Sequence, residues 1–587
     1  MTALGRIQQH LTEIYGRQKA GILYEQILKI LDKYKVSIPA DIARPGVGSG
    51  LSEKDVVLIT YGDQFQADGE RPLKVLHQFL AENLVGEISG VHILPFFPYS
   101  SDDGFSIIDY REVDQLLGEW DDIKRISNDF DVMFDAVINH TSRQSDWFKS
   151  FLRGDTPCDE SFIVVDPSVD LSMVVRPRAL PLITPVETSS GIQYVWTTFS
   201  DDQMDLDYSS DYVLLEIIDL LLYYVSQGSR FLRLDAIAYL WKEIGTSCIH
   251  LPQTHFIVKL FRAILDEIAP QVLIITETNV PHEENINYFG DLVPETGRTD
   301  EAQLVYQFPL APLILHTFRE ENVSRLAEWV RTLDSESIFF NFTASHDGIG
   351  VMPARGILTD DEIHNLVEQT ISHGGQVSNK ANFDGSNSVY ELNITGYDAL
   401  NDPKDTDIDL GVRKFLASQA IMLVLSGVPG IYVHSLLGSR NCYQCVDESG
   451  RARSINREKF QYKDLLGQLA DDDSRTSRVF NGYKHLLNVR KSIPAFNPLG
   501  DQRILNLDPG VFSLIRTSPD EKDRVICLTN VTSRRRVITL SLFDFDWLND
   551  KYWIDNISDA EHEVRDSNLQ LDLDVYQSIW LKPEIAS

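Results

Sequence analysis

The chain has 587 residues, with 53 basic and 87 acidic side chains, so its formal net charge at pH 7 is −34. Its 43% hydrophobic and 10% aromatic residues suffice for a large core, which excludes a disordered or fibrous protein. The acidity excludes a general nucleic-acid or anionic-membrane binder, because a polyanion would be repelled at long range. A highly soluble surface and adaptation to a salt-rich host both remain compatible with this charge.

Residues 1–50 carry apolar positions at helical spacing and end in a glycine- and proline-rich stretch at 45–50, which predicts an N-terminal helical extension. Eight short apolar runs then alternate with helical patterns, as parallel strands buried on both faces do. The expected strands are 56–61, 90–95, 132–138, 231–235, 272–277, 304–308, 338–342 and 430–433, and the clearest helices are 73–84, 212–225 and 256–268.

The strand count predicts an α/β fold, a (β/α)₈ TIM barrel over residues 51–496, with its chemistry at the C-terminal ends of the strands. A doubly wound open sheet is the alternative, but it usually has a glycine-rich phosphate loop after the first strand, which is absent here. The long segment 141–207 predicts an inserted subdomain after the third strand. Alternating runs at 511–515, 525–528 and 537–540 predict a C-terminal antiparallel β domain over 497–587.

Five cysteines are too few for a disulfide scaffold. Cys442 and Cys445 form a C-x-x-C pair, but no second pair follows at zinc-ligand spacing, so we predict that both are ordinary thiols. The N-terminus lacks the apolar core of a signal peptide. The uncharged stretch 415–439 contains Gln, Ser, Gly and Pro, which favours a buried helix, turn and strand over a membrane span. We therefore predict a cytoplasmic protein with no membrane partner.

Charged and imidazole side chains fall at the ends of several expected strands. A single acid there is usually a helix cap or an ion-pair partner, but the barrel would bring the whole set into one pocket. Carboxyls held close raise one another's pKa, so one can stay protonated as an acid while another is an ionised nucleophile. Glycosidic bond cleavage requires that division of labour. The residues are His140, Arg233, Asp235, Glu277, His346 and Asp347.

Four segments, 135–140 (DAVINH), 233–239 (RLDAIAY), 275–279 (ITETN) and 345–350 (SHDGIG), resemble the ordered signature regions of the α-amylase superfamily, and more narrowly of its sucrose phosphorylase subfamily. The resemblance covers roughly residues 55–460 and leaves 1–50 unmatched. Further matches lie at 58–63, 93–97, 102–105, 176–178, 245–248 and 455–457.

The resemblance implies a role for each matching residue. Asp235 would be the nucleophile that forms a covalent β-glucosyl ester, Glu277 the general acid/base, and Asp347 the stabiliser of the oxocarbenium-like transition state. Two successive inversions retain the anomeric configuration, which predicts that the Asp235 and Glu277 carboxyls lie about 5–5.5 Å apart. Arg233 would hold Asp235 ionised, and the glucose pocket would be lined by Asp102, His140, His346 and Arg457.

In this subfamily the second acceptor is phosphate, and the product is α-glucose 1-phosphate. Arg176 and Arg178 are the best candidates to meet that anion, because arginine offers a planar fork of donors, although a solvated loop face is the plainer interpretation of either residue alone. Tyr239 and Tyr390 match positions that flank the acceptor site.

The chain departs from sucrose phosphorylases around the acceptor. It has Glu277-Thr278-Asn279 where they carry Glu-Val-His, and Tyr390-Glu391-Leu392-Asn393 where they carry Tyr-Gln-Val-Asn; the insertion 378–385 differs too. These segments, with 248–255 and 278–282, are similar to glucosylglycerate phosphorylases, which implies phosphorolysis of 2-O-α-glucosylglycerate. Sucrose, sucrose 6-phosphate and glucosylglycerol are the alternative substrates. Glu391 is awkward beside an anionic acceptor: it would contact hydroxyls, or it would argue for a neutral acceptor.

A more distant alternative is an α-glucoside hydrolase or transglucosidase, since transfer to water needs no new residue. Another is a non-catalytic amylase-like protein, but the presence of Asp235, Glu277 and Asp347 together argues against it. We expect no cofactor, with inorganic phosphate as a substrate. Asn139 matches a calcium-binding position of many α-amylases, but the subfamily generally lacks the ion, so no metal is expected. The expected partners are a small sugar and phosphate, without nucleic acid, and a homodimer is compatible with the sequence.

Overall fold

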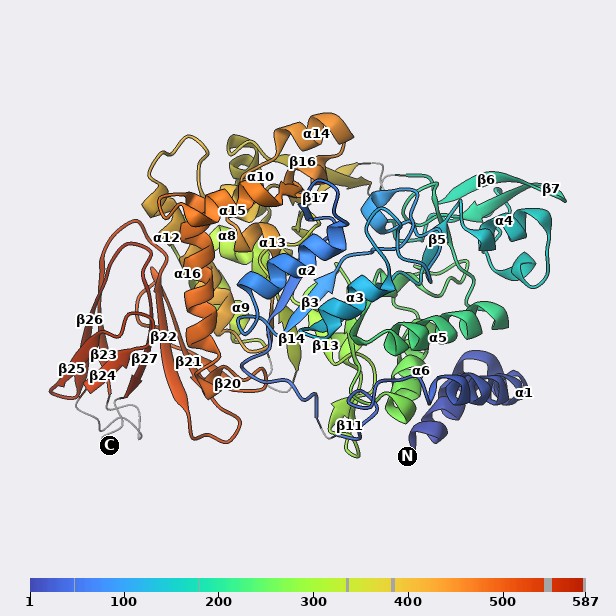
Figure 1. Ribbon diagram of the computed structural model, residues 1–587, viewed down its shortest axis with the longest axis horizontal. Helices are drawn as coiled ribbons and strands as arrows, with labels where there is room; N and C mark the ends of the chain where they lie inside the picture. Colours follow the sequence, from blue (N-terminus) through green and yellow to red (C-terminus); the bar gives the residue numbers. More distant parts are fainter. Residues whose placement is uncertain (47, 179, 334–336, 382–385, 543–551, 584–587) are drawn as a thin grey trace.

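In this computed structural model, eight parallel strands close into a barrel in the order β1, β18, β14, β13, β10, β9, β4, β3 (Figure 1). The structure describes all 587 residues except 47, 179, 334–336, 382–385, 543–551 and 584–587. The eight predicted strands are all present, so the (β/α)₈ barrel is confirmed and the open sheet is excluded. The strands are β1 Val57–Thr60, β3 Gly90–Ile93, β4 Asp131–Ala136, β9 Ser229–Leu234, β10 Leu273–Thr276, β13 Leu304–Tyr306, β14 Ile338–Asn341 and β18 Val428–Tyr432.

The register of three neighbouring strands determines what meets at the barrel rim. Arg233 of β9 pairs with Asp135 of β4 on one side and with Ile275 of β10 on the other. Leu234 and Thr276 are the last paired residues of β9 and β10. The next residues along the chain, Asp235 and Glu277, therefore leave the sheet side by side at its C-terminal edge, where barrel enzymes carry their chemistry.

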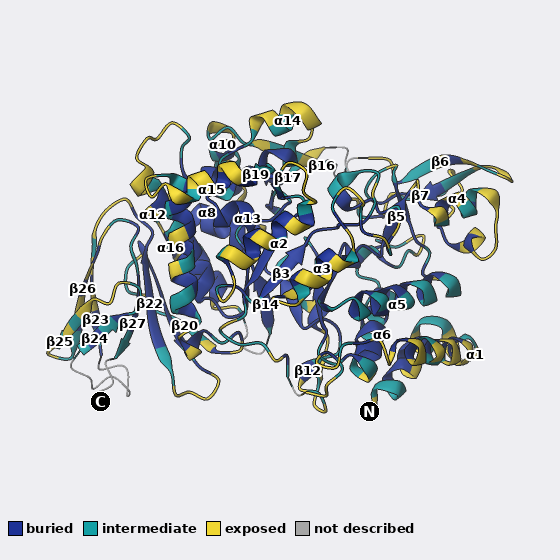
Figure 2. Ribbon diagram, viewed as in Figure 1, coloured by how far each residue is buried: buried dark blue, intermediate teal, exposed yellow. Residues whose placement is uncertain are grey.

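Helices cover the outside of the barrel, and the strands are buried on both faces (Figure 2). The three predicted helices correspond to α2 Pro72–Asn83, α5 Asp211–Ser226 and α6 Pro252–Ile268. The uncharged stretch forms helix α12 (Ile408–Val424) and strand β18, as predicted. Gly427 makes the turn between them with φ of 112°, and a Cβ there would lie 2.3 Å from the Phe339 carbonyl oxygen. None of the helices described here is both long and apolar enough to traverse a lipid bilayer.

The N-terminal extension is a helix, α1 (Ala3–Tyr34), interrupted at Gly16, where φ is 76°. It packs against α6 and α5 (Figure 1), and its apolar face joins the main core through Ile7, Leu11, Leu23, Ile27 and Leu31. Polar contacts hold it as well: Arg6 pairs with Asp266 at 2.7 Å, and the Tyr15 hydroxyl donates to the Tyr208 carbonyl at 2.6 Å. The extension thus packs on two of the helices that surround the barrel.

The segment after the third barrel strand leaves the barrel and returns. Its first strand, β5 (His140–Ser142), pairs antiparallel with its last, β8 (Gln203–Asp205). Between them lie α4 (Asp146–Arg153) and the hairpin of β6 (Ile183–Thr188) and β7 (Gly191–Trp196). A small core of Val165, Val174, Leu182 and Trp196 packs within this segment and against Cys248, which lies between β9 and α6.

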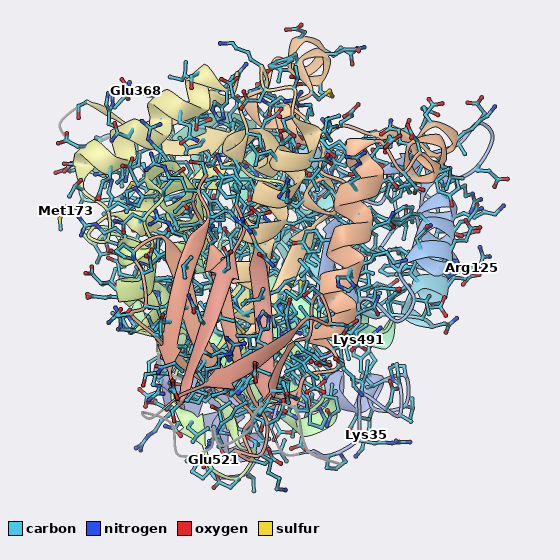
Figure 3. The ribbon with its side chains drawn as sticks, turned by 90° about the vertical axis from the view of Figure 1, so that its left-hand side faces the viewer. Lys35, Arg125, Met173, Glu368, Lys491 and Glu521 are labelled. Carbon is cyan, nitrogen blue, oxygen red and sulfur yellow. A yellow bond between two sulfur atoms is a disulfide. The ribbon has the colours of Figure 1, made fainter. Side chains whose placement is uncertain are left out.

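The C-terminal region is an eight-stranded antiparallel sheet, as predicted, and Figure 3 views the molecule from its side. It is anchored to the barrel by Arg516, fully buried, which donates to the carbonyls of Val424 and Asn497, each at 2.7 Å. In spatial order the strands are β20 Asp501–Ile504, β21 Val511–Thr517, β22 Arg524–Asn530, β27 Ser578–Pro583, β24 Tyr552–Asp555, β25 Glu561–Arg565, β26 Asn568–Leu573 and β23 Arg536–Ser541.

The prediction that Cys442 and Cys445 are ordinary thiols was wrong, because the two form a disulfide. Cys442 is the N-cap of α14 (Tyr443–Ser449) and Cys445 lies at its third position. An N-cap side chain faces the third residue of its helix, and the Cα atoms are 5.3 Å apart, within the range that a disulfide requires. The remaining cysteines, Cys158, Cys248 and Cys527, are buried and free.

Thiol counting tests this pairing. Unfolded, unreduced protein is expected to react with a thiol reagent at the three free cysteines, and reduced protein at all five in the sequence. Five reactive thiols without reductant would contradict the disulfide. The double variant Cys442→Ser/Cys445→Ser serves as the control and should give three in both conditions.

A pair of isoleucines on α1 tests whether the extension is part of the core. Ile27 is fully buried, so Ile27→Ala should lower the free energy of unfolding by about 2–5 kcal/mol. Ile22, on the same helix and 57% exposed, is the matched control and should change it by less than about 0.5 kcal/mol. Equal effects in denaturant titrations would show that α1 does not pack as described.

Candidate active site

Asp235 and Glu277 face one another at the ends of β9 and β10. The backbone between them adopts an unusual conformation, with Ala236 in the left-handed region at φ of 51°. There the Ala236 N–H donates to Glu277 Oε2 at 3.2 Å. Such backbone conformations persist only where the surroundings enforce them, and they concentrate at functional sites.

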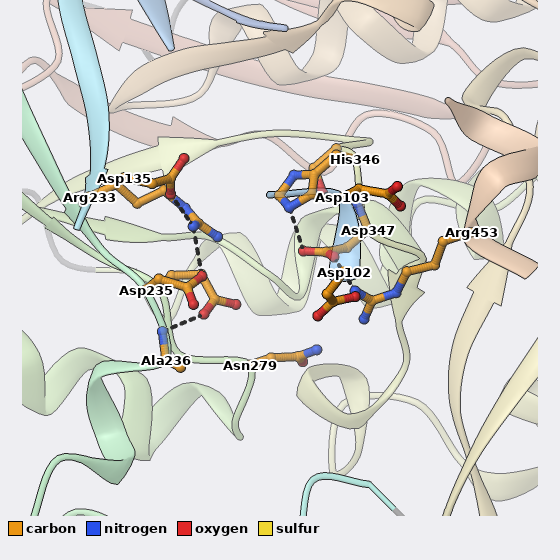
Figure 4. A network of polar contacts seen from close by, with 12 residues as sticks. Asp102, Asp103, Asp135, Arg233, Asp235, Ala236, Asn279, His346, Asp347 and Arg453 are labelled. Atoms are coloured by element: carbon orange, nitrogen blue, oxygen red, sulfur yellow. Dashed lines mark hydrogen bonds and ion pairs between the residues drawn. The ribbon is translucent and has the colours of Figure 1, made fainter. Parts of the chain in front are cut away.

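Arg233 lies between Asp135 and Asp235 and is almost completely buried (Figure 4). Its NH1 donates to Asp235 Oδ1 at 2.8 Å and also to Asp135, and its Nε donates to the Tyr306 hydroxyl at 3.1 Å. On the far side, Asp135 contacts His92 Nε2 at 2.7 Å. The guanidinium is thus fixed between two carboxylates, and one of them is Asp235.

Asp347 enters the same space from beyond β14. Its Oδ1 lies 2.6 Å from Arg453 NH1 and 3.8 Å from Arg457 NH2, and its Oδ2 lies 3.5 Å from His346 Nε2. The His346 ring stacks on Phe105 with centroids 5.0 Å apart, and its carbonyl accepts from Arg457 Nε at 2.7 Å. The third acid is therefore held between two arginines.

The returning segment completes the opposite wall. Arg178 donates to Asp102 Oδ2 at 3.1 Å. Gln203 Nε2 lies 3.4 Å from the same Asp102 oxygen and 3.1 Å from His140 Nε2. His140 Nε2 is also 2.9 Å from the Phe105 carbonyl oxygen.

These side chains enclose a cavity of about 90 Å³, which adjoins an outer cavity of about 510 Å³. Asp102, Arg178, Tyr390, Glu391 and Arg453 line both cavities, so they form the junction between them. Eleven predicted residues line the inner cavity: Asp102, His140, Arg178, Asp235, Tyr239, Glu277, Asn279, His346, Asp347, Tyr390 and Glu391.

Two other predicted residues support the inner cavity from outside it. Arg233 lies below Asp235, and Arg457 holds the His346 backbone. Arg176 is the exception: its side chain is exposed while its neighbours Val174 and Pro177 are buried, and it is not among the lining residues. Its contact with phosphate stays a prediction. Within the differing insertion, 382–385 lies outside the described residues.

Sequence reasoning missed Arg453, Gln203, Phe105 and Phe199, which also line the inner cavity. For Arg453 a signal existed, because it comes two residues before the matched segment 455–457. The structure also shows what Glu391 contacts: Arg453 donates to both of its carboxylate oxygens, from NH2 at 2.6 Å and from Nε at 3.0 Å. Glu391 is therefore not a free anion facing the acceptor.

The acids of the cavity differ in their affinity for protons. Burial, and then the charge of Glu277, raise the pKa of Asp235 to about 8 against the opposing charge of Arg233. Burial likewise raises the pKa of Glu277. Burial is also the largest single influence on Asp347, but the charges of Arg453, His346, Arg457 and Arg233 together outweigh it and hold the pKa of that carboxyl well below its ordinary value. The carboxyls of Asp235 and Glu277 therefore both hold a proton more tightly than an ordinary Asp or Glu side chain does.

Asn139 contacts a lysine. The Lys242 ammonium donates to Asn139 Oδ1 at 2.9 Å and lies 2.6 Å from Asp205 Oδ2, and both charged side chains are almost fully buried. Within the described parts of the chain, no group of three or more His, Cys, Asp or Glu side chains is arranged to hold a metal ion.

Comparison with known proteins places the chain in a family. The model of the α-amylase catalytic domain matches residues 85–347. A glucosylglycerate phosphorylase of Spirochaeta thermophila is 48% identical over 99% of both chains, and one of Allomeiothermus silvanus is 50% identical over 91% of this chain and 93% of that relative.

The chain belongs to the α-amylase superfamily. Within it the chain is a member of the sucrose phosphorylase subfamily, as the four signature segments predicted. The crystal structure of a sucrose 6F-phosphate phosphorylase from Thermoanaerobacter thermosaccharolyticum superposes with a TM-score of 0.71 at 25% identity, covering 84% of this chain and 96% of that one.

The raised pKa of Asp235 predicts how stability depends on pH. A folded-state pKa of about 8, against about 3.9 in the unfolded chain, means that the folded state binds more protons between these values. Stability from this group therefore falls as pH rises from about 4 to about 8. Asp235→Asn should remove that penalty, so its Tm relative to the parent should be higher at pH 8 than at pH 5.

The control is Asp146→Asn, since the Asp146 side chain is 93% exposed. Its Tm difference from the parent should be the same at the two pH values. A difference for Asp235→Asn that shrinks as pH rises would show that Asp235 is not destabilised as an anion.

Proposed function

We propose that this protein is a retaining α-glucoside phosphorylase that cleaves 2-O-α-glucosylglycerate with phosphate, giving α-glucose 1-phosphate and glycerate. The observation that carries the proposal is the convergence of Asp235, Glu277 and Asp347 on one cavity, in a chain about half identical to proteins named for this activity. Sucrose, sucrose 6-phosphate and glucosylglycerol are the alternative substrates.

In the first step an Asp235 oxygen attacks the anomeric carbon while the bond to the glycerate oxygen breaks. Glu277 donates its proton to that oxygen, and glycerate leaves with a restored hydroxyl. The Arg233 contact at 2.8 Å favours the anion on Asp235. Glu277 accepts a bond from the Ala236 N–H at 3.2 Å, so in the singly ionised pair we assign the remaining proton to Glu277. The pair is thereby set for nucleophilic attack and general acid catalysis.

In the second step phosphate takes the place of glycerate. A phosphate oxygen attacks the anomeric carbon, the ester bond to Asp235 breaks, and the ionised Glu277 accepts the proton of the attacking phosphate hydroxyl. Two inversions give the α-anomer of glucose 1-phosphate. The separation of about 5–5.5 Å between the two carboxyls remains a prediction of this mechanism.

Asp347 acts in both steps. Arg453 and Arg457 keep its carboxylate ionised, and in a buried site a fixed negative charge stabilises the positive charge that develops on the sugar ring. Asp347 would also accept hydrogen bonds from sugar hydroxyls, as the family resemblance implies.

Acceptor screening tests the reaction. Purified protein is incubated with α-glucose 1-phosphate and glycerate, fructose, fructose 6-phosphate or glycerol, and phosphate release is measured. Glycerate should give the fastest release. An inert glycerate with a reactive fructose or glycerol would exclude the proposed substrate, whereas glucose formed in water without any acceptor dependence would favour a hydrolase.

Leaving-group dependence tests the two catalytic acids separately. Glu277→Gln should slow glucosylglycerate cleavage by about 10²–10⁴ but react normally in its first step with α-glucosyl fluoride, whose leaving group needs no proton. Asp235→Asn should fail with both donors. Glu283→Gln, at an exposed acid a few residues away, is the control, and equal loss with both donors in Glu277→Gln would contradict its role as the acid.

Beyond the reaction, we retain the predictions of a cytoplasmic location, of a reaction without a cofactor, and of small-molecule partners only. A homodimer stays compatible with the sequence.

A further inference from the structure

Arg453 carries charge and hydrogen-bond donors that the mechanism above does not fully use. It lies in the 3₁₀ helix η6 (Ala452–Asn456). Three of its nitrogens lie close to carboxylate oxygens: Nε and NH2 to those of Glu391 at 3.0 and 2.6 Å, and NH1 to that of Asp347 at 2.6 Å. A guanidinium has five N–H donors, so these contacts leave two donors on its outer nitrogens.

The position of Arg453 places those donors on the acceptor side of the sugar. It lines both the inner cavity, with the three acids, and the outer cavity of about 510 Å³. A glucosyl unit attached to Asp235 fills the inner cavity, so the acceptor must approach through the junction of the two. Arg453 is at that junction.

An anionic acceptor also needs a cation there. The inner cavity is lined by five carboxyls, Asp102, Asp235, Glu277, Asp347 and Glu391, but by two guanidiniums, those of Arg178 and Arg453. Arg178 sits 3.1 Å from Asp102 and is 32% exposed. Arg453 is the more buried of the two, at 23% exposure of its side chain, and its guanidinium plane is fixed by the two bonds to Glu391.

We propose that Arg453 binds the oxyanion of the acceptor, the carboxylate of glycerate or an oxygen pair of phosphate, and that Glu391 is a positioning residue that holds the Arg453 guanidinium for this purpose. The proposal rests on the proposed function. A planar fork of donors suits both oxyanions, so one residue serves two substrates that occupy the site in alternation. Glu391 keeps the local charge balanced, which allows each anion to leave again.

Acceptor charge provides the test. Glycerate and glycerol differ by a carboxylate in place of a CH₂OH group, so the ratio of their kcat/KM values, with α-glucose 1-phosphate as donor, isolates recognition of the anion. Arg453→Gln should lower kcat/KM for glycerate about 10- to 100-fold more than for glycerol, as expected for loss of charge-assisted hydrogen bonds. The KM for phosphate in the cleavage direction should rise in parallel.

Two further variants complete the design. Arg453→Lys keeps the positive charge but not the planar pair of donors, so it should lower the glycerate-to-glycerol ratio of kcat/KM by less than Arg453→Gln does. It also replaces Arg453→Gln in the test if that variant does not fold. Arg413→Gln, which removes an exposed surface charge paired with Asp574 at 3.5 Å, should leave the ratio unchanged.

A double-mutant cycle tests the part assigned to Glu391. If Glu391 acts through Arg453, Glu391→Gln should change the glycerate-to-glycerol ratio in the parent and have no further effect in Arg453→Gln. Additive effects would show that Glu391 acts independently of Arg453.

Equal losses for glycerate and glycerol, with an unchanged KM for phosphate, would overturn the proposal and leave Arg453 as a support for Asp347. Failure of the proposed function would give a different result, because the unmutated protein itself would then not use glycerate as an acceptor. If the parent uses another acceptor in place of glycerate, the KM for phosphate with that glucoside still decides the role of Arg453.

Discussion

The site depends on the buried guanidinium of Arg233, held between Asp135 and Asp235. Burying an ion is costly unless it is paired and hydrogen-bonded. Here the register of β4 and β9 places Asp135 opposite Arg233, and Asp235 follows Arg233 two residues later in the chain. The charge of Arg233 thereby offsets part of the effect of burial, which raises the pKa of Asp235. Glu277 reaches the same place through the register of β9 and β10, and there it accepts a hydrogen bond from the Ala236 N–H.

The sequence was enough to predict those features that depend on the apolar pattern or the motif of a single segment. Eight apolar runs gave the barrel, and residues at strand ends such as Asp235 and Glu277 proved to be neighbours, because parallel strands in register bring their ends together. Contacts between distant segments could not be found in this way. The pairing of Glu391 with Arg453 joins strand β17 (Asn387–Asn393) to the 3₁₀ helix η6, 62 residues further along the chain. The disulfide depends on a helix cap whose position no apolar pattern marks.

The site has the same excess of acids as the protein as a whole, so net charge does not explain how it would bind an anion. The protein as a whole is strongly acidic, and its inner cavity also contains more carboxyls than guanidiniums. Each arginine there is paired with an acid, Arg178 with Asp102 and Arg453 with Glu391 and Asp347. An anion is therefore met by oriented donors whose positive charge is already offset by neighbouring carboxylates, which suits a site where substrates must exchange.

The unequal size of the two cavities limits what this protein can accept. The inner cavity, at about 90 Å³, is well below the few hundred cubic ångströms of common ligand pockets. Under the proposed function, a donor would place one glucosyl unit beside the three acids and the rest of the molecule in the outer cavity of about 510 Å³. Discrimination by size would then act at the inner end of the site, and discrimination by charge at the junction.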